Sequence, residues 1–386
     1  MTKILIPRIS SLVALGLLVG STTESFATIY DIGGGSHLET SLKASEDYDS
    51  NIFLRSDQVD DYITSASASV KIVRDVALVA STLSAGATAS MFADHSDQNS
   101  IDPYVAADAA FSPSDKTKAS ISLVYRHSTI ANEVVQARTK SDDLDVGGSL
   151  QSLFSEKLGW RGTGAYRDDN YRTAGYAHVF DYSAGLDAVY VYSPKLTMLA
   201  GYTYRESWTG HRTAGSGDPS NTDDRYSVGF EGELAPKITG TLSVGWTKRS
   251  FHAKGFSDTS GLFLSSGLKW IPAQKTSVVL DASQDFDVTA ANQSSKNTSI
   301  SIGVTQIIND KWSVDGSFAY THAAYVAAVT AGNRRDDNSR VKGRVSYAMA
   351  TNLMLEFSAG YGNVDSTNRF STYDRVNVGV ALSTSF

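Results

Sequence analysis

The last strand-like segment of the chain constrains the fold most, because apolar and small polar residues alternate there over eleven positions. One parity holds Val376, Val378, Val380, Leu382 and Phe386, and the other holds Asn377, Gly379, Ser383 and Ser385. Successive side chains of a strand point to opposite faces, so this segment predicts one apolar and one polar face. A tilted strand of about 9–11 residues crosses the hydrocarbon core of a bilayer. The alternative is a terminal edge strand in a soluble sandwich, but the same pattern repeats along the whole chain and favours a membrane strand.

Both ends of the chain predict export to the bacterial outer membrane. Lys3 and Arg8 precede an apolar run from Leu12 to Val19 and a small-x-small site at Ser25-Phe26-Ala27, so we predict a signal peptide at 1–27, cleaved after Ala27. The apolar run is shorter than the roughly 20 residues of a transmembrane helix. The final aromatic, Phe386, resembles the signal by which the barrel assembly machinery recognises outer-membrane proteins.

Short turns recur about every 40 residues and organise the middle of the chain. They are predicted at Arg74-Asp75, Ser112–Lys116, Ser155–Leu158, Ser193–Leu196, Ala235–Ile238, Pro272–Lys275, Asn309–Trp312 and Ala350–Leu353. Longer polar segments lie between them, such as His211 to Asp223 and Ala331 to Asn338. Short turns that alternate with long loops are typical of outer-membrane barrels, with the turns in the periplasm. A propeller has a similar period but places four strands in each repeat.

The predicted fold is therefore all-β: a transmembrane antiparallel up-and-down barrel of about eighteen strands, with sixteen as the alternative count. The first strand is expected at Ser36 to Glu46 and the last at Asp374 to Phe386. No linker divides residues 28–386, so we predict one domain. Either count leaves room for a water-filled channel.

Charged residues on the polar parity are predicted to line the lumen, because charges on the lipid face cost about 2–4 kcal/mol at the midplane. The candidates are Arg340, Lys342 and Arg344 on one strand, Asp281, Asp285 and Asp287 on another, and Arg161, Arg167, Glu231 and Glu233 elsewhere. Two interpretations stay open. The basic and acidic strips could face each other and order polar solutes in a transverse field, or these residues could pair across strands and partly fill the lumen.

Five Asp-Asp pairs are assigned to loops at the outer rim: Asp60-Asp61, Asp142-Asp143, Asp168-Asp169, Asp223-Asp224 and Asp336-Asp337. One hypothesis is that they bind divalent cations that bridge lipopolysaccharide phosphates, since hard cations prefer oxygen ligands. The other interpretation is a solvated loop edge that favours turns.

Catalytic and metal-binding patterns are missing from the sequence. The chain has no cysteine, and its seven histidines form no metal-binding motif. No catalytic triad or dyad stands out, so we expect no enzyme activity, no cofactor and no metal. Acidic residues outnumber basic ones, 41 to 34, which argues against a nucleic-acid partner.

The segment Tyr48-Asp49-Ser50-Asn51-Ile52-Phe53, followed by Asp61-Tyr62-Ile63-Thr64, resembles the opening of the putative β-barrel porin-2 family. The resemblance implies an outer-membrane barrel without agreed catalytic residues. Many relatives in that family are associated with exopolysaccharide export, beside a periplasmic polysaccharide-export protein. Asp49 and Asn51 could also serve structurally, by satisfying a turn at the outer end of the first hairpin.

We therefore expect an outer-membrane channel, with a passive conduit for exported polysaccharide as the leading hypothesis. A polar lumen offers a sugar chain hydrogen bonds in exchange for those to water. Few lumenal aromatics are evident to stack on sugar rings, which weakens this hypothesis. The alternatives are a general diffusion porin for small hydrophilic solutes and a structural or adhesive surface protein with a blocked lumen.

Overall fold

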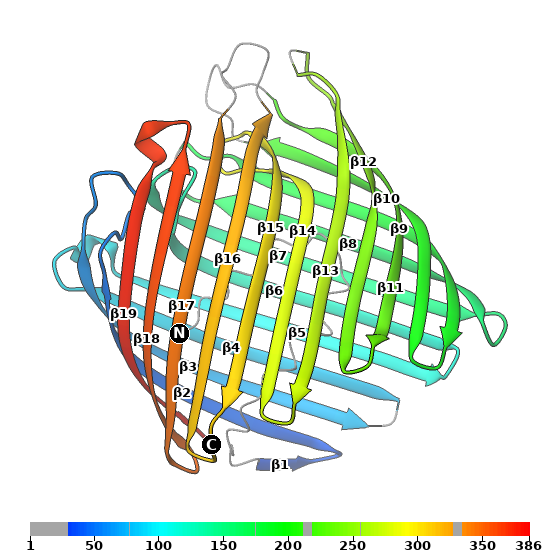
Figure 1. Ribbon diagram of the computed structural model, residues 1–386, viewed down its shortest axis with the longest axis horizontal. Helices are drawn as coiled ribbons and strands as arrows, with labels where there is room; N and C mark the ends of the chain where they lie inside the picture. Colours follow the sequence, from blue (N-terminus) through cyan, green and yellow to red (C-terminus); the bar gives the residue numbers. More distant parts are fainter. Residues whose placement is uncertain (1–29, 77, 174, 211–217, 255, 327–333) are drawn as a thin grey trace.

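The computed structural model describes residues 30–76, 78–173, 175–210, 218–254, 256–326 and 334–386, which form a closed antiparallel barrel (Figure 1). The predicted signal peptide at 1–27 lies outside the described residues. The sheet has 19 strands, of which the short β1 (Tyr30–Gly33) pairs with β2, so the barrel itself consists of the remaining eighteen. The predicted fold class and strand count are confirmed.

The barrel strands are 13 to 17 residues long, enough to cross a bilayer when tilted. They are β2 (Ser36–Asp49), β3 (Asp61–Val76), β4 (Val79–Phe92), β5 (Ser100–Ser114), β6 (Thr117–Asn132), β7 (Ala137–Leu153), β8 (Leu158–Tyr171), β9 (His178–Ser193) and β10 (Leu196–Gly210). The second half comprises β11 (Asn221–Ala235), β12 (Ile238–Phe251), β13 (Thr259–Ala273), β14 (Thr276–Val288), β15 (Ser294–Ile307), β16 (Trp312–Val326), β17 (Arg335–Ala350), β18 (Leu353–Ser366) and β19 (Tyr373–Ser385). Two single-turn 3-10 helices, η2 (Ser96–Gln98) and η3 (Arg369–Ser371), lie in connections. No helix among the described residues is long and apolar enough to cross a membrane.

The barrel closes where β19 pairs with β2, from Asn377 opposite Asp49 to Ser385 opposite Ser41. The terminal Phe386 extends this seam, because its backbone N–H donates to the Thr40 carbonyl at 2.9 Å and its carbonyl accepts from the Thr40 N–H at 2.8 Å. Closure leaves the sheet without an unpaired edge in the bilayer.

The predicted short turns fall between consecutive strands at one end of the barrel, here called the turn end. In the turn at Ala235–Ile238, Pro236 fixes the first central position, and Lys237 takes the left-handed conformation (φ 66°) that the second requires. The turn predicted at Arg74-Asp75 lies three residues before the connection between β3 and β4. Both residues belong to β3, which stays paired with β4 as far as Val76 opposite Val79.

The longer connections gather at the opposite end, the loop end, where η3 lies at the top of the view in Figure 1. Of the two predicted long segments, residues 211–217 and 327–333 lie outside the described part of the chain. β11 already begins at Asn221 and β17 at Arg335, so the regular barrel wall extends into both segments.

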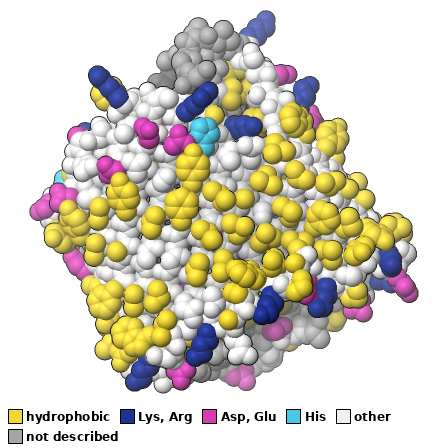
Figure 2. All heavy atoms as spheres, viewed as in Figure 1, with side chains coloured by type: hydrophobic (Ala, Val, Ile, Leu, Met, Phe, Trp, Pro, Cys, Tyr) yellow, Lys and Arg dark blue, Asp and Glu magenta, His cyan; other side chains and the backbone are white. Residues whose placement is uncertain are grey.

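The outer wall is apolar, as the alternation predicts. Figure 2 shows hydrophobic side chains spread across this wall, with acidic and basic side chains concentrated towards its margins. Large residues of the apolar parity are exposed, and Tyr226, Phe357 and Val378, for example, are half exposed or more. In a membrane protein, these exposed apolar residues form the surface that contacts lipid.

The five Asp-Asp pairs do not form chelating pairs in loops, which corrects that prediction. They lie in or directly beside strands, where neighbouring side chains point to opposite faces of the wall. In each pair at least one carboxylate accepts from a tyrosine hydroxyl: Tyr48–Asp60, Tyr125–Asp142, Tyr166–Asp168, Tyr202–Asp224 and, for both members of the last pair, Tyr325–Asp336 and Tyr320–Asp337. The other carboxylate is held by different partners, as Asp61 is by His95 and Asp223 is by Arg249. Two carboxylates on opposite faces cannot chelate one cation together.

Candidate functional site in the barrel lumen

The connection between β6 and β7 crosses the lumen at the loop end. Its four residues, Glu133–Gln136, are here called the β6–β7 tip. Glu133 forms an ion pair with Arg340 of β17 and accepts a hydrogen bond from the Asn338 side chain at 2.6 Å. Six strands separate β6 from β17 by the shorter way around the barrel. The contact therefore spans the interior, and the tip narrows the passage.

Two further contacts hold this crossing in place. The Gln136 side chain donates to the Phe370 carbonyl in the β18–β19 connection. Ala131, just before the tip, packs against a buried cluster of Leu54, Val364 and Tyr373. Leu54 belongs to the first loop, so this loop also folds inward beneath the tip.

The first-loop motif fixes that inward fold to the seam of the barrel. Asp49 is bound by the Arg375 guanidinium, with Nε at 2.9 Å, and the Ser50 hydroxyl accepts from the Val376 N–H at 2.8 Å.

Asn51 is completely buried; its amide donates to the carbonyls of Arg55 at 2.7 Å and Asp374 at 3.2 Å. The next residue, Ile52, is 1% exposed. Of the motif's outer residues, Tyr48 packs against Tyr62, and Phe53 against His95. The motif thus joins the first loop to β19, a broader role than the predicted local turn.

Replacement of Asn51 by alanine is expected to destabilise the barrel by about 1–3 kcal/mol, because this completely buried side chain makes three hydrogen bonds to backbone groups of Arg55 and Asp374. Urea unfolding of the refolded protein measures the change. Asn363→Ala is the matched control, since that amide binds the Asp374 side chain at an exposed position. Equal losses in both variants would contradict a structural role specific to the motif.

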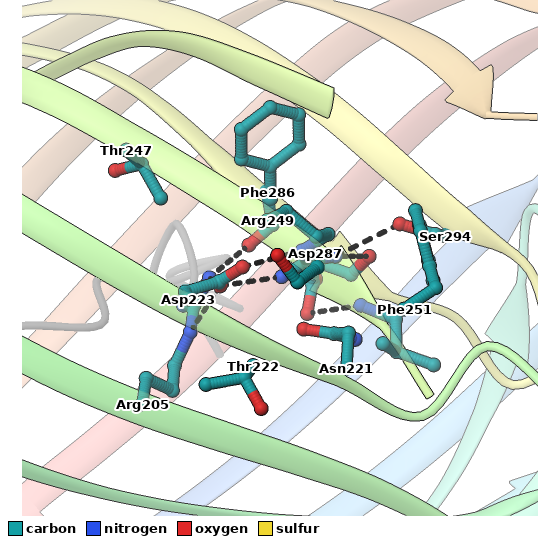
Figure 3. Close-up of polar contacts among 12 residues, drawn as sticks. Arg205, Asn221, Thr222, Asp223, Thr247, Arg249, Phe251, Phe286, Asp287 and Ser294 are labelled. Atoms are coloured by element: carbon teal, nitrogen blue, oxygen red, sulfur yellow. Dashed lines mark hydrogen bonds and ion pairs between the residues drawn. The ribbon is translucent and has the colours of Figure 1, made fainter. Parts of the chain in front are cut away.

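A buried charged network occupies the lumen side of β10–β14 at the loop end (Figure 3). It consists of Arg205, Asp223, Arg225, Arg249 and Asp285. Asp223 lies between two guanidiniums, accepting from Arg249 at 2.7 Å through both of its oxygens and from Arg205 Nε at 2.9 Å. Asp285 accepts from Arg225 at 2.6 and 2.7 Å and from Arg205 at 3.1 Å. Each carboxylate accepts hydrogen bonds from two guanidiniums, which offsets part of the cost of removing these charges from water.

The end of β14 leaves the barrel wall to complete this network. Its pairing with β13 stops at Gln284 opposite Leu264, while its pairing with β15 continues to Val288. Phe286 is consequently buried, with its ring 5.0 Å from the Arg249 guanidinium carbon and its carbonyl accepting from Arg205 at 2.8 Å. Arg225 stacks similarly on Phe263, at 3.8 Å. These contacts fill the lumen here and hold the three arginines rigidly.

A second inward contact covers the network. The Ala177 N–H, from the β8–β9 connection, donates to the Ala290 carbonyl of the β14–β15 connection at 2.9 Å. Four strands lie between β9 and β14, so these two connections meet over the lumen. Ala177, Val179 and Val288 form a small buried apolar cluster at the contact.

The predicted basic and acidic strips do not face each other across the pore. They lie on β17 and β14, and only β15 and β16 separate these two strands. The predicted residues instead join local networks. Asp285 belongs to the buried charged network, the Asp287 carbonyl accepts from Arg249, and Asp281 accepts from the Ser301 hydroxyl at 3.3 Å.

The other predicted lumen residues, except Lys342, also have partners in the described part of the chain, mostly on nearby strands. Arg161 binds Glu231 of β11 at 2.8 Å, and Arg167 binds Asp169. Glu233 binds Lys195 at 2.6 Å near the turn end. Arg344 contacts Asp315 at 3.2 Å and Glu356 at 3.1 Å, and Glu356 also pairs with Lys43. The pairing interpretation therefore describes these residues better than the transverse field.

Several important residues were missing from the sequence prediction. Arg225, Arg249 and Arg375 lie on the lumen parity of β11, β12 and β19, opposite to the parity that carries the apolar outward residues of these strands. The alternation therefore predicts that all three face the lumen. No sequence signal identifies Glu133, whose role depends on where the β6–β7 tip lands.

Comparison with known proteins gives a family and a set of similar barrels. The family described as putative beta-barrel porin 2 matches residues 32–386. No curated protein matches the chain. Among solved structures, Pseudomonas aeruginosa OpdK with vanillate has 10% identity and a TM-score of 0.48, covering 90% of this chain and 99% of that chain. Pseudomonas aeruginosa OccK2 (OpdF) has 9% identity and a TM-score of 0.47, with coverage of 90% and 98%. The siderophore receptor PirA from the same organism has 8% identity and a TM-score of 0.45, with coverage of 90% and 80%.

Proposed function

Because the chain belongs to the putative beta-barrel porin 2 family, an outer-membrane β-barrel family, we propose that it is a passive diffusion channel for small hydrophilic solutes. The observation that carries this proposal is the β6–β7 tip, which is held across the lumen by the Glu133–Arg340 ion pair. An eighteen-stranded barrel is wide enough to enclose water, and an inward tip converts a wide lumen into a size-selective one.

The charged inner wall supports passage of polar solutes. Its ion pairs, such as Arg161–Glu231 and Lys43–Glu356, are partly accessible and present donors and acceptors along the lumen. A solute can exchange hydrogen bonds to water for bonds to these groups at small net cost.

The polysaccharide-conduit hypothesis receives no comparable support. Aromatic side chains that stack on sugar rings would have to be exposed inside the barrel. Four aromatics on the inner side, Phe263, Phe286, Tyr325 and Tyr373, are buried, the first three against arginines and Tyr373 in the cluster beneath the tip, whereas Tyr104 of β5 is only partly buried. Polysaccharide export stays a prediction, tested by measuring secreted and periplasmic polymer in a strain that lacks the gene.

Two measurements on the purified full-length protein test the channel proposal. In planar bilayers it should conduct ions without an applied gating signal, and in liposomes it should admit neutral sugars at rates that fall as the sugar grows. A correctly folded barrel that neither conducts nor admits the smallest sugar would overturn the proposal and favour a structural or adhesive protein.

A further inference from the structure

Lys342 differs from every other residue of the predicted basic strip. Arg340 above it is paired with Glu133, and Arg344 below it is paired with Asp315 and Glu356. Lys342 is exposed on the lumen parity of β17, and the structure shows no hydrogen bond or ion pair to it from any residue in the described ranges. The charges that act on it are those of Arg340 and Arg375, which are both positive.

The wall beside Lys342 has room for a ligand. Lys342 lies opposite Gly360 of β18, and Gly360 lies opposite Asn377 of β19. Gly360 carries no side chain between the two, and the stem of Lys342 lies against it, since a Cβ at Gly360 would be 3.4 Å from the Lys342 Cγ. Two strand spacings of about 4.8 Å each separate the backbones that carry Lys342 and Asn377. A small oxyanion fits between an ammonium on one side and an amide on the other.

Arg340 and Arg375 are the basic residues next to this position. They form the next row towards the loop end, on either side of Gly362. Each already holds one carboxylate, Glu133 or Asp49, so their own charges are compensated locally and Lys342 is left in excess. The row of Arg340, Gly362 and Arg375 lies directly beneath the β6–β7 tip, since Glu133 of the tip binds Arg340. A solute that passes the tip therefore meets Lys342 next.

We propose that Lys342, with Asn377 and the bare wall at Gly360, forms a binding subsite for the oxyanion of a small solute, a carboxylate or a phosphate. This inference rests on the proposed channel function and adds a substrate class to it. Lysine and arginine side chains in pores favour anions in this way, and charge-assisted hydrogen bonds to oxyanions are among the stronger polar contacts.

Solute block of single-channel current tests the subsite. Succinate and inorganic phosphate are added separately to the wild-type channel in a planar bilayer, with erythritol as the neutral probe. At least one of the two anions should block the current in a concentration-dependent manner, and erythritol should not. Block by succinate alone identifies a carboxylate subsite, block by phosphate alone a phosphate subsite, and block by both a general oxyanion subsite.

The Lys342→Gln variant should weaken that block by about two- to fivefold, the value of one accessible charge pair. Lys342→Arg should retain it. The matched control is Lys71→Gln, which removes one charge from a lysine of β3 that is paired with Glu39 at 3.1 Å. A channel that conducts but is blocked by neither anion would overturn the subsite and leave the channel proposal intact. Equal block in wild type and Lys342→Gln would overturn the role of Lys342, whereas absence of conductance in wild type would contradict the channel itself.

Discussion

Shortening the β6–β7 tip is expected to raise single-channel conductance by about twofold, because the diameter of the narrowest section limits passage. The variant replaces Glu133–Gln136 with the dipeptide Asn-Gly, which closes a two-residue hairpin between Asn132 and Ala137 without a change of register. It removes the Glu133 contacts to Arg340 and Asn338 and the Gln136 contact to Phe370 together. Larger neutral sugars should also enter liposomes faster than through the wild-type channel.

A charge exchange separates the ion pair from the length of the tip. Glu133→Arg places two like charges together at Arg340 and should release the tip, giving noisier and larger currents. The double variant Glu133→Arg with Arg340→Glu restores an ion pair of opposite orientation and should return the conductance towards the wild-type value. Conductance that stays at the wild-type level in the shortened variant, with the barrel shown to be folded, would mean that another segment sets the width of the pore.

Replacement of Arg249 by alanine is expected to lower the free energy of unfolding by about 3–5 kcal/mol, the usual cost of breaking one side of a buried ion pair. Arg249 is fully buried and donates to Asp223, to the Asp287 carbonyl at 3.1 Å and to the Ser294 hydroxyl at 2.8 Å. Without it, Asp223 keeps only Arg205, and the inward end of β14 loses a contact to β12. Urea unfolding of the refolded barrel, followed by tryptophan fluorescence, measures the loss.

The neighbouring Lys248 provides the matched control for this variant. It is exposed on the opposite face of β12, so Lys248→Ala should change stability by no more than about 0.5 kcal/mol. Similar losses for Arg249→Ala and Lys248→Ala would show that the buried charged network does not support the barrel.

Prediction from the sequence was most accurate for features that depend on local alternation. The closing strand is an example: Val376, Val378 and Val380 face outward as their parity requires, and the strand found at Tyr373–Ser385 nearly coincides with the predicted one. The turn at Ala235–Ile238 was predictable because Pro236 favours a turn wherever it occurs between two strands.

The Asp-Asp pairs show where local chemistry was insufficient. Adjacent aspartates suggest a loop that could chelate a cation, and Asp142-Asp143 has the composition of such a loop. Strand β7 includes both residues, so Asp142 turns to Tyr125 and His127 on one face while Asp143 lies on the other. Composition favoured a turn, but pairing with β6 and β8 kept the strand extended through these positions.

The sequence by itself determined the barrel and the two faces of its wall, because these follow from a period of two and from turn residues at regular intervals, and it limited the strand number to sixteen or eighteen. Only the tertiary structure decided which charges meet and how wide the passage is. Glu133 and Arg340 are 207 positions apart in sequence and meet because the β6–β7 tip folds across a closed barrel. Asp285 joins Arg205 because the end of β14 separates from β13. Such contacts depend on the curvature of the closed wall and on where each connection folds, and neither is recorded in the residues of a single strand.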